Sequence, residues 1–177
     1  MSTFLIGGGW DTAEVYEPFV RAVGGGRRIG CLIVDEGDGT TLFERYAEVL
    51  RKAGPDSTPV PLLVPLGSRF EPDDALDGVD GLLVCGGLTP AYQEALAGCL
   101  ERLPALLTRR GMPYAGFSAG AAVAARRAVV GGWLAGGGRC ARKRAGRTWP
   151  RWRYGRGSAW CPSRWTSTPP GGGRSRA

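Results

Sequence analysis

A serine between glycines, placed directly after a short apolar run, is the feature of this sequence that most limits its fold. The run is Met112–Ala115, and it leads into Gly116-Phe117-Ser118-Ala119-Gly120-Ala121. This pattern is typical of a nucleophile elbow, in which a strand turns sharply into a helix and presents the serine at the turn. Glycines are expected on both sides because a Cβ atom there would collide with the strand or block a ligand. The segment therefore predicts a strand, a strained turn at Ser118 and a helix.

Short apolar runs bounded by turn residues alternate with helical periodicity through residues 1–130. The expected strands are Thr3–Ile6, Arg28–Val34, Val60–Leu66, Gly81–Val84 and Pro113–Gly116. The expected helices are Val15–Val23, Thr41–Ala53, Thr89–Leu100 and Ala119–Arg126. Strands this apolar, with helices between them, indicate a parallel sheet that is covered on both faces. We predict an α/β protein with three layers, α/β/α, and a mostly parallel sheet.

The 177 residues suffice for one such domain, but the chain changes character near its end. All 16 acidic residues lie at or before Glu101, whereas only seven of the 23 basic residues do. From about Trp133, aliphatic residues almost disappear among Arg, Gly, Trp and Pro. Such a segment buries too little apolar surface to offset the entropy cost of ordering. We therefore expect an α/β domain over residues 1–133 and a disordered basic tail over residues 134–177.

Five cysteines and the lack of histidine restrict redox, metal and cofactor chemistry. The cysteines are Cys31, Cys85, Cys99, Cys140 and Cys161. Their odd number and the absence of CxxC spacing favour free thiols, with Cys85 buried and inert, and no metal site or cofactor is expected. Gly7-Gly8-Gly9 lacks the lysine and the spacing of phosphate-binding loops. No apolar run is long enough for a membrane span and the start lacks signal-peptide features, so a cytoplasmic protein without membrane association is expected.

Three glycine-containing segments follow expected strands and would meet at one edge of the sheet. They are Gly7-Gly8-Gly9, Cys85-Gly86-Gly87-Leu88-Thr89 and the elbow. In open α/β sheets, ligands bind at this carboxyl edge. Val84–Thr89, followed about 30 residues later by Gly116–Ala121, resembles the paired motifs of the dipeptidase E and cyanophycinase family of serine peptidases. The resemblance covers residues 1–133, and the fold of that family is similar to the class I glutamine amidotransferase domain.

The resemblance implies a hydrolase that cleaves a peptide or isopeptide bond of a small peptide through an acyl-enzyme on Ser118. The backbone N–H groups of Gly87 and Ala119 would form the oxyanion hole. Family members have a histidine base and an acidic partner after the serine, and neither residue type follows Ser118 here. We therefore expect an impaired enzyme that lacks the C-terminal part of the fold. Cys85 and Leu88 replace residues that are often glycine and polar in the family, which leaves the substrate open.

Two interpretations of the tail remain open. Codons permitted for Arg139–Thr168 can be chosen so that a shifted frame encodes acidic and β-branched residues and an Asp-Val-His segment, its histidine arising across the Ser167 and Thr168 codons. The tail would then be the out-of-frame product of a frameshift. If the tail is genuine, its arginines and tryptophans would contact phosphates and bases. The chain would then be a non-catalytic α/β domain that binds nucleic acid, with Ser118 a small residue at a tight turn. The oligomeric state is open in both cases.

Overall fold

A five-stranded parallel sheet forms the centre of the molecule in a computed structural model, which describes residues 1–131, 134–135, 138–139 and 153–156. The strands are β1 (Thr3–Ile6), β2 (Arg28–Asp35), β3 (Thr58–Pro65), β4 (Gly81–Val84) and β5 (Tyr114–Phe117). They are arranged in the order β1-β5-β4-β2-β3, and every neighbouring pair is parallel. The predicted α/β class and parallel sheet are confirmed.

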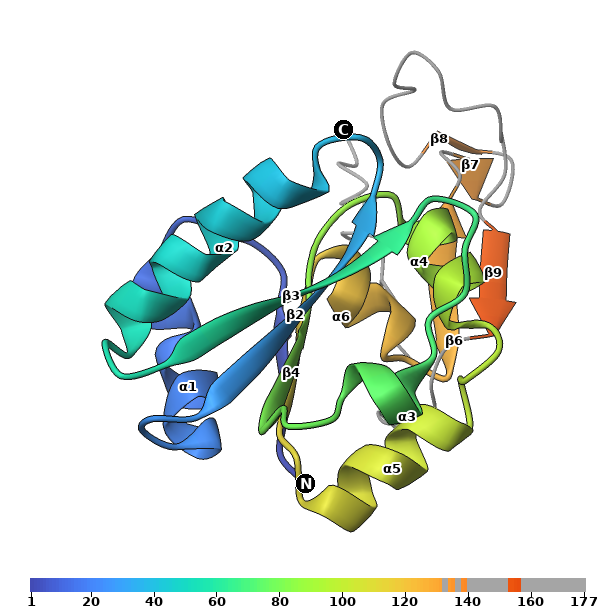
Figure 1. Cartoon of the computed structure of the whole chain (residues 1–177). Coiled ribbons are helices and arrows are strands. Elements are labelled where there is room, and N and C mark those ends of the chain that lie inside the picture. The colour runs from blue at the N-terminus through green and yellow to red at the C-terminus, as the bar shows by residue number, and fades with distance from the viewer. Residues whose placement is uncertain (132–133, 136–137, 140–152, 157–177) are drawn as a thin grey trace, which may run out of the picture.

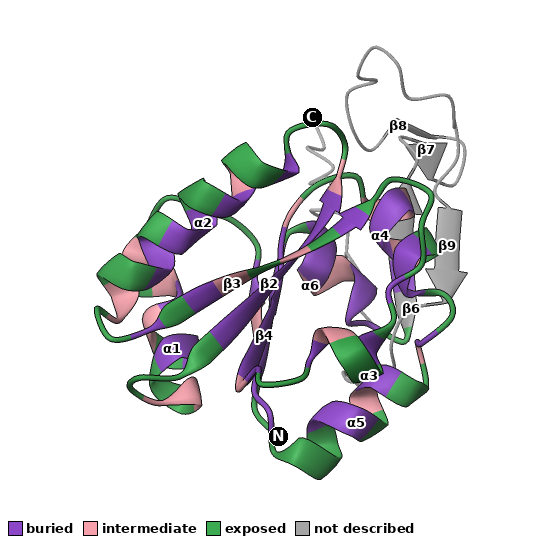
Figure 2. Cartoon of the chain, in the orientation of Figure 1, coloured by how far each residue is buried: buried purple, intermediate pink, exposed green. Residues whose placement is uncertain are grey.

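Helices cover both faces of the sheet (Figure 1). One face carries η1 (Ala13–Val15), α1 (Glu17–Val23) and α2 (Gly39–Ala53). The other carries α3 (Pro72–Ala75), α4 (Thr89–Leu96), α5 (Arg102–Arg110) and α6 (Ala119–Val123). Successive strand side chains point to opposite faces, so Leu82 joins one buried cluster and Leu83 the other. Figure 2 shows the buried strands between these helices, and the predicted three layers are confirmed.

The helices differ from the expected ones mainly in their ends. The helix expected over Val15–Val23 starts only at Glu17, with Pro18 in its first turn, where a missing N–H costs nothing. Those expected to end at Leu100 and Arg126 end at Leu96 and Val123. The sequence did not predict α3 or α5. In α5, Pro104 and the arginines interrupt the apolar pattern of the sequence, so the helix was not recognised. The helix buries three leucines, namely Leu103, Leu106 and Leu107.

Beyond the sheet, short antiparallel strands follow α6. β6 (Arg127–Gly131) pairs with β9 (Arg153–Arg156), and β7 (Leu134–Ala135) pairs with β8 (Gly138–Arg139). The rest of the predicted tail, with Cys140 and Cys161, lies outside the described residues. Among the residues that are described, the free cysteines are Cys31, Cys85 and Cys99, all buried, and no helix is both long and apolar enough to cross a membrane.

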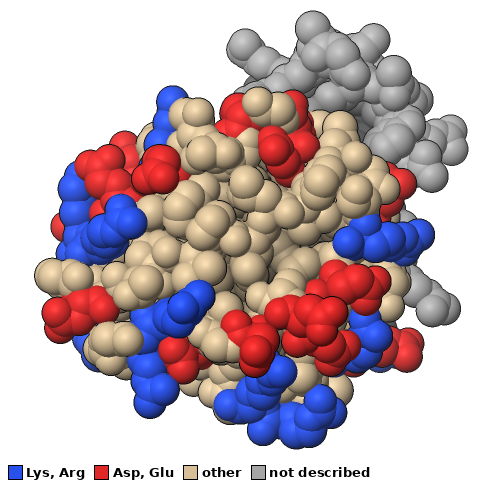
Figure 3. All heavy atoms as spheres, in the orientation of Figure 1, with Lys and Arg blue, Asp and Glu red and all other residues tan. Residues whose placement is uncertain are grey.

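The outer edge of β3 is protected by prolines. The N–H groups of Thr58 and Leu66 donate to Arg27 and Asp35, so even-numbered residues direct their backbone groups toward β2. Odd-numbered residues of β3 therefore direct theirs outward. Three of these four residues lack an N–H, namely Pro59, Pro61 and Pro65. Figure 3 shows few charged side chains over this edge, so missing donors are its main defence against strand pairing with another chain.

Pro61→Val should make the protein self-associate. The substitution restores an outward N–H on an exposed edge strand and introduces a β-branched residue. Sedimentation velocity over a concentration series should show larger species for this variant than for the wild type. Pro55→Val, in the exposed turn before β3, is the matched control and should sediment like the wild type. Wild-type behaviour of the Pro61 variant at every concentration would contradict the edge assignment.

Asp35 holds the turn that leads from β2 into α2. Its Oδ1 accepts the N–H groups of Gly37 and Gly39, each at 2.8 Å. These two N–H groups, Gly37 first, lower the pKa of the Asp35 carboxyl. A Cβ on Gly39 would lie 2.7 Å from Asp35 Cγ, so α2 begins with a glycine packed on this carboxylate. The turn places Glu36 at the carboxyl edge of the sheet.

The stabilisation from Asp35 should depend on pH. Because the folded-state pKa is lowered, the ionised carboxylate stabilises the fold above about pH 4 and loses this effect as pH falls through the lowered value. Asp35→Asn should therefore be less stable than the wild type at pH 7, and the difference should shrink in acid. Urea unfolding of both proteins from pH 7 to pH 2.5 measures it. A difference that stays constant over this range would rule out an ionised Asp35 as the cause.

Candidate functional site

Ser118 occupies a strained turn between β5 and α6. Its backbone angles are φ 50° and ψ −103°, and among the described residues it is the only non-glycine residue with positive φ. Its N–H donates to the Ile6 carbonyl at 2.9 Å, and its carbonyl accepts the Ala122 N–H at 2.9 Å. Ser118 is exposed although its neighbours Phe117 and Ala119 are buried. The turn thus lifts the serine out of the core, as the sequence predicted.

The glycines around Ser118 are required by backbone packing. A Cβ on Gly120 would lie 2.1 Å from the Val84 carbonyl oxygen, and one on Gly116 would lie 2.6 Å from Gly120 backbone atoms. Gly120 also donates its N–H to the Cys85 carbonyl at 3.2 Å and accepts the Tyr114 hydroxyl at 2.7 Å. The first turn of α6 therefore rests directly on the ends of β4 and β5. This contact ties the serine turn to the neighbouring strand.

Gly120→Ala should destabilise the protein by about 3 kcal/mol or more, because the added methyl group cannot fit without moving β4 or α6. Gly7→Ala is the matched control, since a Cβ there meets nothing within 4 Å and Gly7 does not have positive φ. Urea unfolding of the two variants should show a large loss for the first and none for the second. Equal stabilities would contradict the close contact.

Ser118→Gly should be more stable than Ser118→Ala by about 1 kcal/mol. Both changes remove the hydroxyl, but only glycine adopts these backbone angles without strain, and its entropy cost offsets part of the gain. Chemical denaturation gives the free energy of unfolding of both variants. Because both lack the hydroxyl, the difference between them measures the strain in the backbone at residue 118. An alanine variant as stable as the glycine variant would show that the turn relaxes at no cost.

The loop after β4 lies beside this turn. β4 and β5 are neighbours with Val84 opposite Gly116, and a Cβ on Gly86 would lie 3.0 Å from the Phe117 ring. Gly87 and Ser118, both exposed, therefore follow adjacent strand ends, as the sequence predicted. Within the described part of the chain, neither the Gly87 N–H nor the Ala119 N–H donates to another protein group. Two backbone N–H groups near the serine, those of Gly87 and Ala119, are therefore available to donate to a ligand.

Cys85 and Leu88, which differ from the family pattern, have opposite environments. Cys85 is fully buried, and burial followed by the neighbouring Cys31 thiol raises its pKa well above the ordinary value. The expectation of a buried Cys85 is confirmed, and its raised pKa fits an unreactive thiol. Leu88 is 38% exposed and presents an apolar side chain beside the loop. Leu88 therefore gives this edge an exposed apolar side chain.

Three tyrosines and one acid that the sequence did not single out also contribute to this edge. Tyr46 and Tyr92 contact Gly86, Tyr114 contacts Gly120, and Glu36 contacts Leu88. Tyr46 lies on the buried side of α2, together with Phe43, Val49 and Leu50. A buried tyrosine normally finds a partner for its hydroxyl. Which backbone group each tyrosine hydroxyl bonds to can be identified only from the tertiary structure.

No general base is in place beside the serine in the residues that the structure describes. Ser118 makes no side-chain hydrogen bond there, including at the start of α6. The same residues contain no group of three or more His, Cys, Asp or Glu side chains that could hold a metal ion. The nucleic-acid alternative depends on the basic tail, nearly all of which lies outside the described residues. In the part of the chain that the structure describes, the geometry therefore supplies an exposed hydroxyl and hydrogen-bond donors without a proton acceptor.

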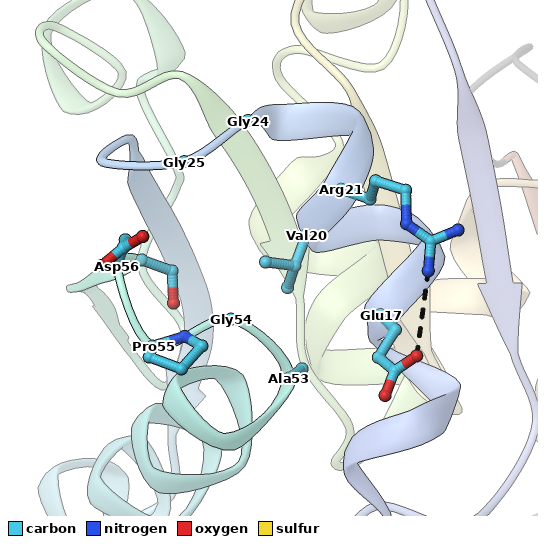
Figure 4. A pocket seen from close by; sticks show the side chains of 10 residues that line it. Glu17, Val20, Arg21, Gly24, Gly25, Ala53, Gly54, Pro55 and Asp56 are labelled. Carbon is cyan, nitrogen blue, oxygen red and sulfur yellow. Dashed lines mark ion pairs between the residues drawn. The ribbon is translucent and has the colours of Figure 1, made fainter.

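A separate cavity lies at the opposite, amino end of the sheet. It measures about 250 Å³ and is bordered by the end of α1 and the turn between α2 and β3 (Figure 4). Glu17 and Arg21 on its rim form an ion pair at 3.9 Å. The exposed strand ends that carry Gly87 and Ser118 do not line it. We therefore place the candidate site at the carboxyl edge, where α/β sheets bind ligands.

Comparison with solved structures agrees with this architecture. One similar structure is that of a protein from Listeria monocytogenes EGD-e named "Putative Peptidase E Protein". The match has a TM-score of 0.54 and 20% sequence identity, and it covers 71% of this chain and 62% of that one. The chain has the peptidase E fold. The match spans less than two thirds of the Listeria protein. At 20% identity, the likeness concerns the fold alone. No protein-family model and no curated protein matches the sequence.

Proposed function

We propose that Ser118 is the nucleophile of a serine-type peptidase site that acts on the peptide or isopeptide bond of a small peptide. The observation that carries the proposal is the strained, exposed turn at Ser118, held by close packing of Gly120 on Val84. Strain of this kind persists only where the surrounding structure enforces it, and it concentrates at functional sites. The peptidase E fold of the similar Listeria protein supports the same reaction class.

In this reaction, Ser118 Oγ bonds to the substrate carbonyl carbon, and the carbonyl oxygen becomes an oxyanion. The N–H groups of Gly87 and Ala119 would donate to this oxyanion. Collapse of the intermediate breaks the C–N bond, and the amine leaves with a proton, giving an acyl-enzyme that water hydrolyses. The Oγ proton needs an acceptor, and the chain has no histidine. We therefore propose a site that binds and acylates slowly, with turnover reduced by up to about 10⁶ from that of a complete triad.

A fluorophosphonate probe should label Ser118 slowly, and Ser118→Ala should abolish labelling. Mass spectrometry of the digested protein identifies the modified residue, and an acid-quenched time course gives the rate. Peptide turnover, measured on a panel of dipeptides, should stay near background in the same preparation. Labelling that survives in the Ser118 variant would refute the nucleophile, whereas turnover at the rate of a complete serine peptidase would refute the impairment.

A further inference from the structure

We propose that Tyr46, Tyr92 and Glu36 are positioning residues that hold the loop of residues 86–88 as one half of an oxyanion hole before any substrate binds. The inference rests on the proposed function of Ser118 and adds to it the groups that fix the donor. It assigns a role to three side chains from α2, α4 and the end of β2. The Tyr46 ring also packs edge-on against Phe117 of the elbow, with 6.0 Å between the ring centroids, so the proposed role concerns its hydroxyl alone.

Both polar groups of Gly86 are held by tyrosine hydroxyls. The Gly86 N–H donates to the Tyr46 hydroxyl oxygen at 3.1 Å, and the Tyr92 hydroxyl donates to the Gly86 carbonyl at 3.2 Å. Tyr46 belongs to the core cluster on one face of the sheet and Tyr92 to the cluster on the other. In Figure 1, their helices α2 and α4 lie on opposite sides of the strands. The loop is therefore fixed from both layers.

The third contact fixes the other side of Gly87. The Leu88 N–H donates to Glu36 Oε1 at 3.2 Å. A Cβ on Gly87 would lie 2.9 Å from the Tyr92 ring and 3.3 Å from Glu36 Oε1, so a side chain here would displace the residues that hold the loop. The N–H groups of residues 86 and 88 are thus both used. The Gly87 N–H between them has no acceptor in the described residues.

The two hydroxyls hold the loop without adding charge beside it. Burial raises the pKa of Tyr46 and of Tyr92, so both phenols are neutral at physiological pH. A donor that is fixed in advance needs no reorganisation when negative charge develops, which is what makes an oxyanion hole effective. The two tyrosine hydrogen bonds are partly buried, which strengthens them relative to exposed ones. These contacts meet the requirement that a functional group be held by a supporting layer of residues.

Because the proposed donors are backbone N–H groups of the loop and the elbow, neither half of the hole depends on a histidine. The chain should therefore stabilise a tetrahedral anion on Ser118 even where turnover is slow. Phenylboronic acid tests this directly. Ser118 Oγ forms a bond to boron, the hydroxyl proton is released to solvent, and neutral trigonal boron becomes a tetrahedral anion with one oxygen in the hole. Boron-11 NMR distinguishes the two geometries.

Titration of the full chain with phenylboronic acid at pH 7 should give a tetrahedral signal that Ser118→Ala abolishes. Tyr46→Phe should weaken the adduct about tenfold or more, because the Gly86 N–H loses its acceptor and the loop loosens. Tyr16→Phe is the matched control, since this buried hydroxyl donates to the Trp10 carbonyl at 3.2 Å and does not contact the loop. Its affinity should equal that of the wild type.

Two substitutions at Glu36 distinguish the effect of its hydrogen bond on the loop from the effect of its negative charge. Glu36→Gln keeps a side-chain oxygen that accepts the Leu88 N–H, so it should retain the wild-type affinity within about threefold. Glu36→Ala removes the acceptor and should weaken the adduct about tenfold. A glutamine variant as weak as the alanine variant would show that charge, and not the hydrogen bond, matters. Equal affinity of Tyr46→Phe and the wild type would overturn the role of Tyr46.

If the wild-type protein forms no adduct with phenylboronic acid, Ser118 is not the nucleophile. The role of Tyr46 in holding the loop can then be tested separately, by amide NMR. Tyr46→Phe should accelerate hydrogen exchange of the Gly86 amide and shift the Gly87 amide resonance, whereas Tyr16→Phe should do neither. Unchanged exchange at Gly86 in the Tyr46 variant would overturn the inference regardless of the chemistry at Ser118.

Discussion

The contact between Gly120 and the Val84 carbonyl is the constraint on which the rest of this edge depends. A Cβ on Gly120 would lie 2.1 Å from the Val84 carbonyl oxygen, so only glycine lets the first turn of α6 lie against the backbone of β4. The short connection from β5 to α6 then forces Ser118 to positive φ and turns its side chain outward. The hydrogen bond from Tyr114 to the Gly120 carbonyl, at 2.7 Å in a buried setting, holds the turn from below. Backbone packing therefore maintains the strain, and no partner of the serine side chain is needed.

The proposed site places its two requirements, anion stabilisation and proton transfer, in different parts of the fold. The proposed oxyanion donors depend on β4, β5, α2 and α4, all of which belong to the parallel sheet and its two layers. A proton acceptor would have to come from another part of the structure, and the chain offers no histidine for it. The donors and the strained serine are therefore properties of the core, whereas proton transfer is not. This separation explains why binding of a tetrahedral anion and slow turnover are expected together.

Sequence patterns predicted the strands closely, because an apolar run between turn residues has clear ends. Gly81–Val84 matches the structure at both ends, and the strand before the elbow is shifted by one residue. The helices were harder. α5 was missed because its leucine stripe is interrupted by proline and arginine, and α1 was extended because the pattern does not show where η1 stops. Periodicity identifies the buried side of an element, but it identifies neither the exact ends nor the partner packed against it.

The sequence by itself determined that a strand, a strained serine turn and a helix follow one another at residues 113–126, since only glycines allow so close a turn. It also determined that the glycine loop after β4 would reach the same edge, since parallel strands end together. Only the tertiary structure decided which side chains hold that loop. Tyr46, Tyr92 and Glu36 are separated from Gly86 and Leu88 by 40, 6 and 52 positions in the chain, and a hydrogen bond over such separations depends on how layers pack. Local sequence determines the backbone geometry of the serine turn, whereas the hydroxyls that bond to Gly86 belong to helices on opposite faces of the sheet.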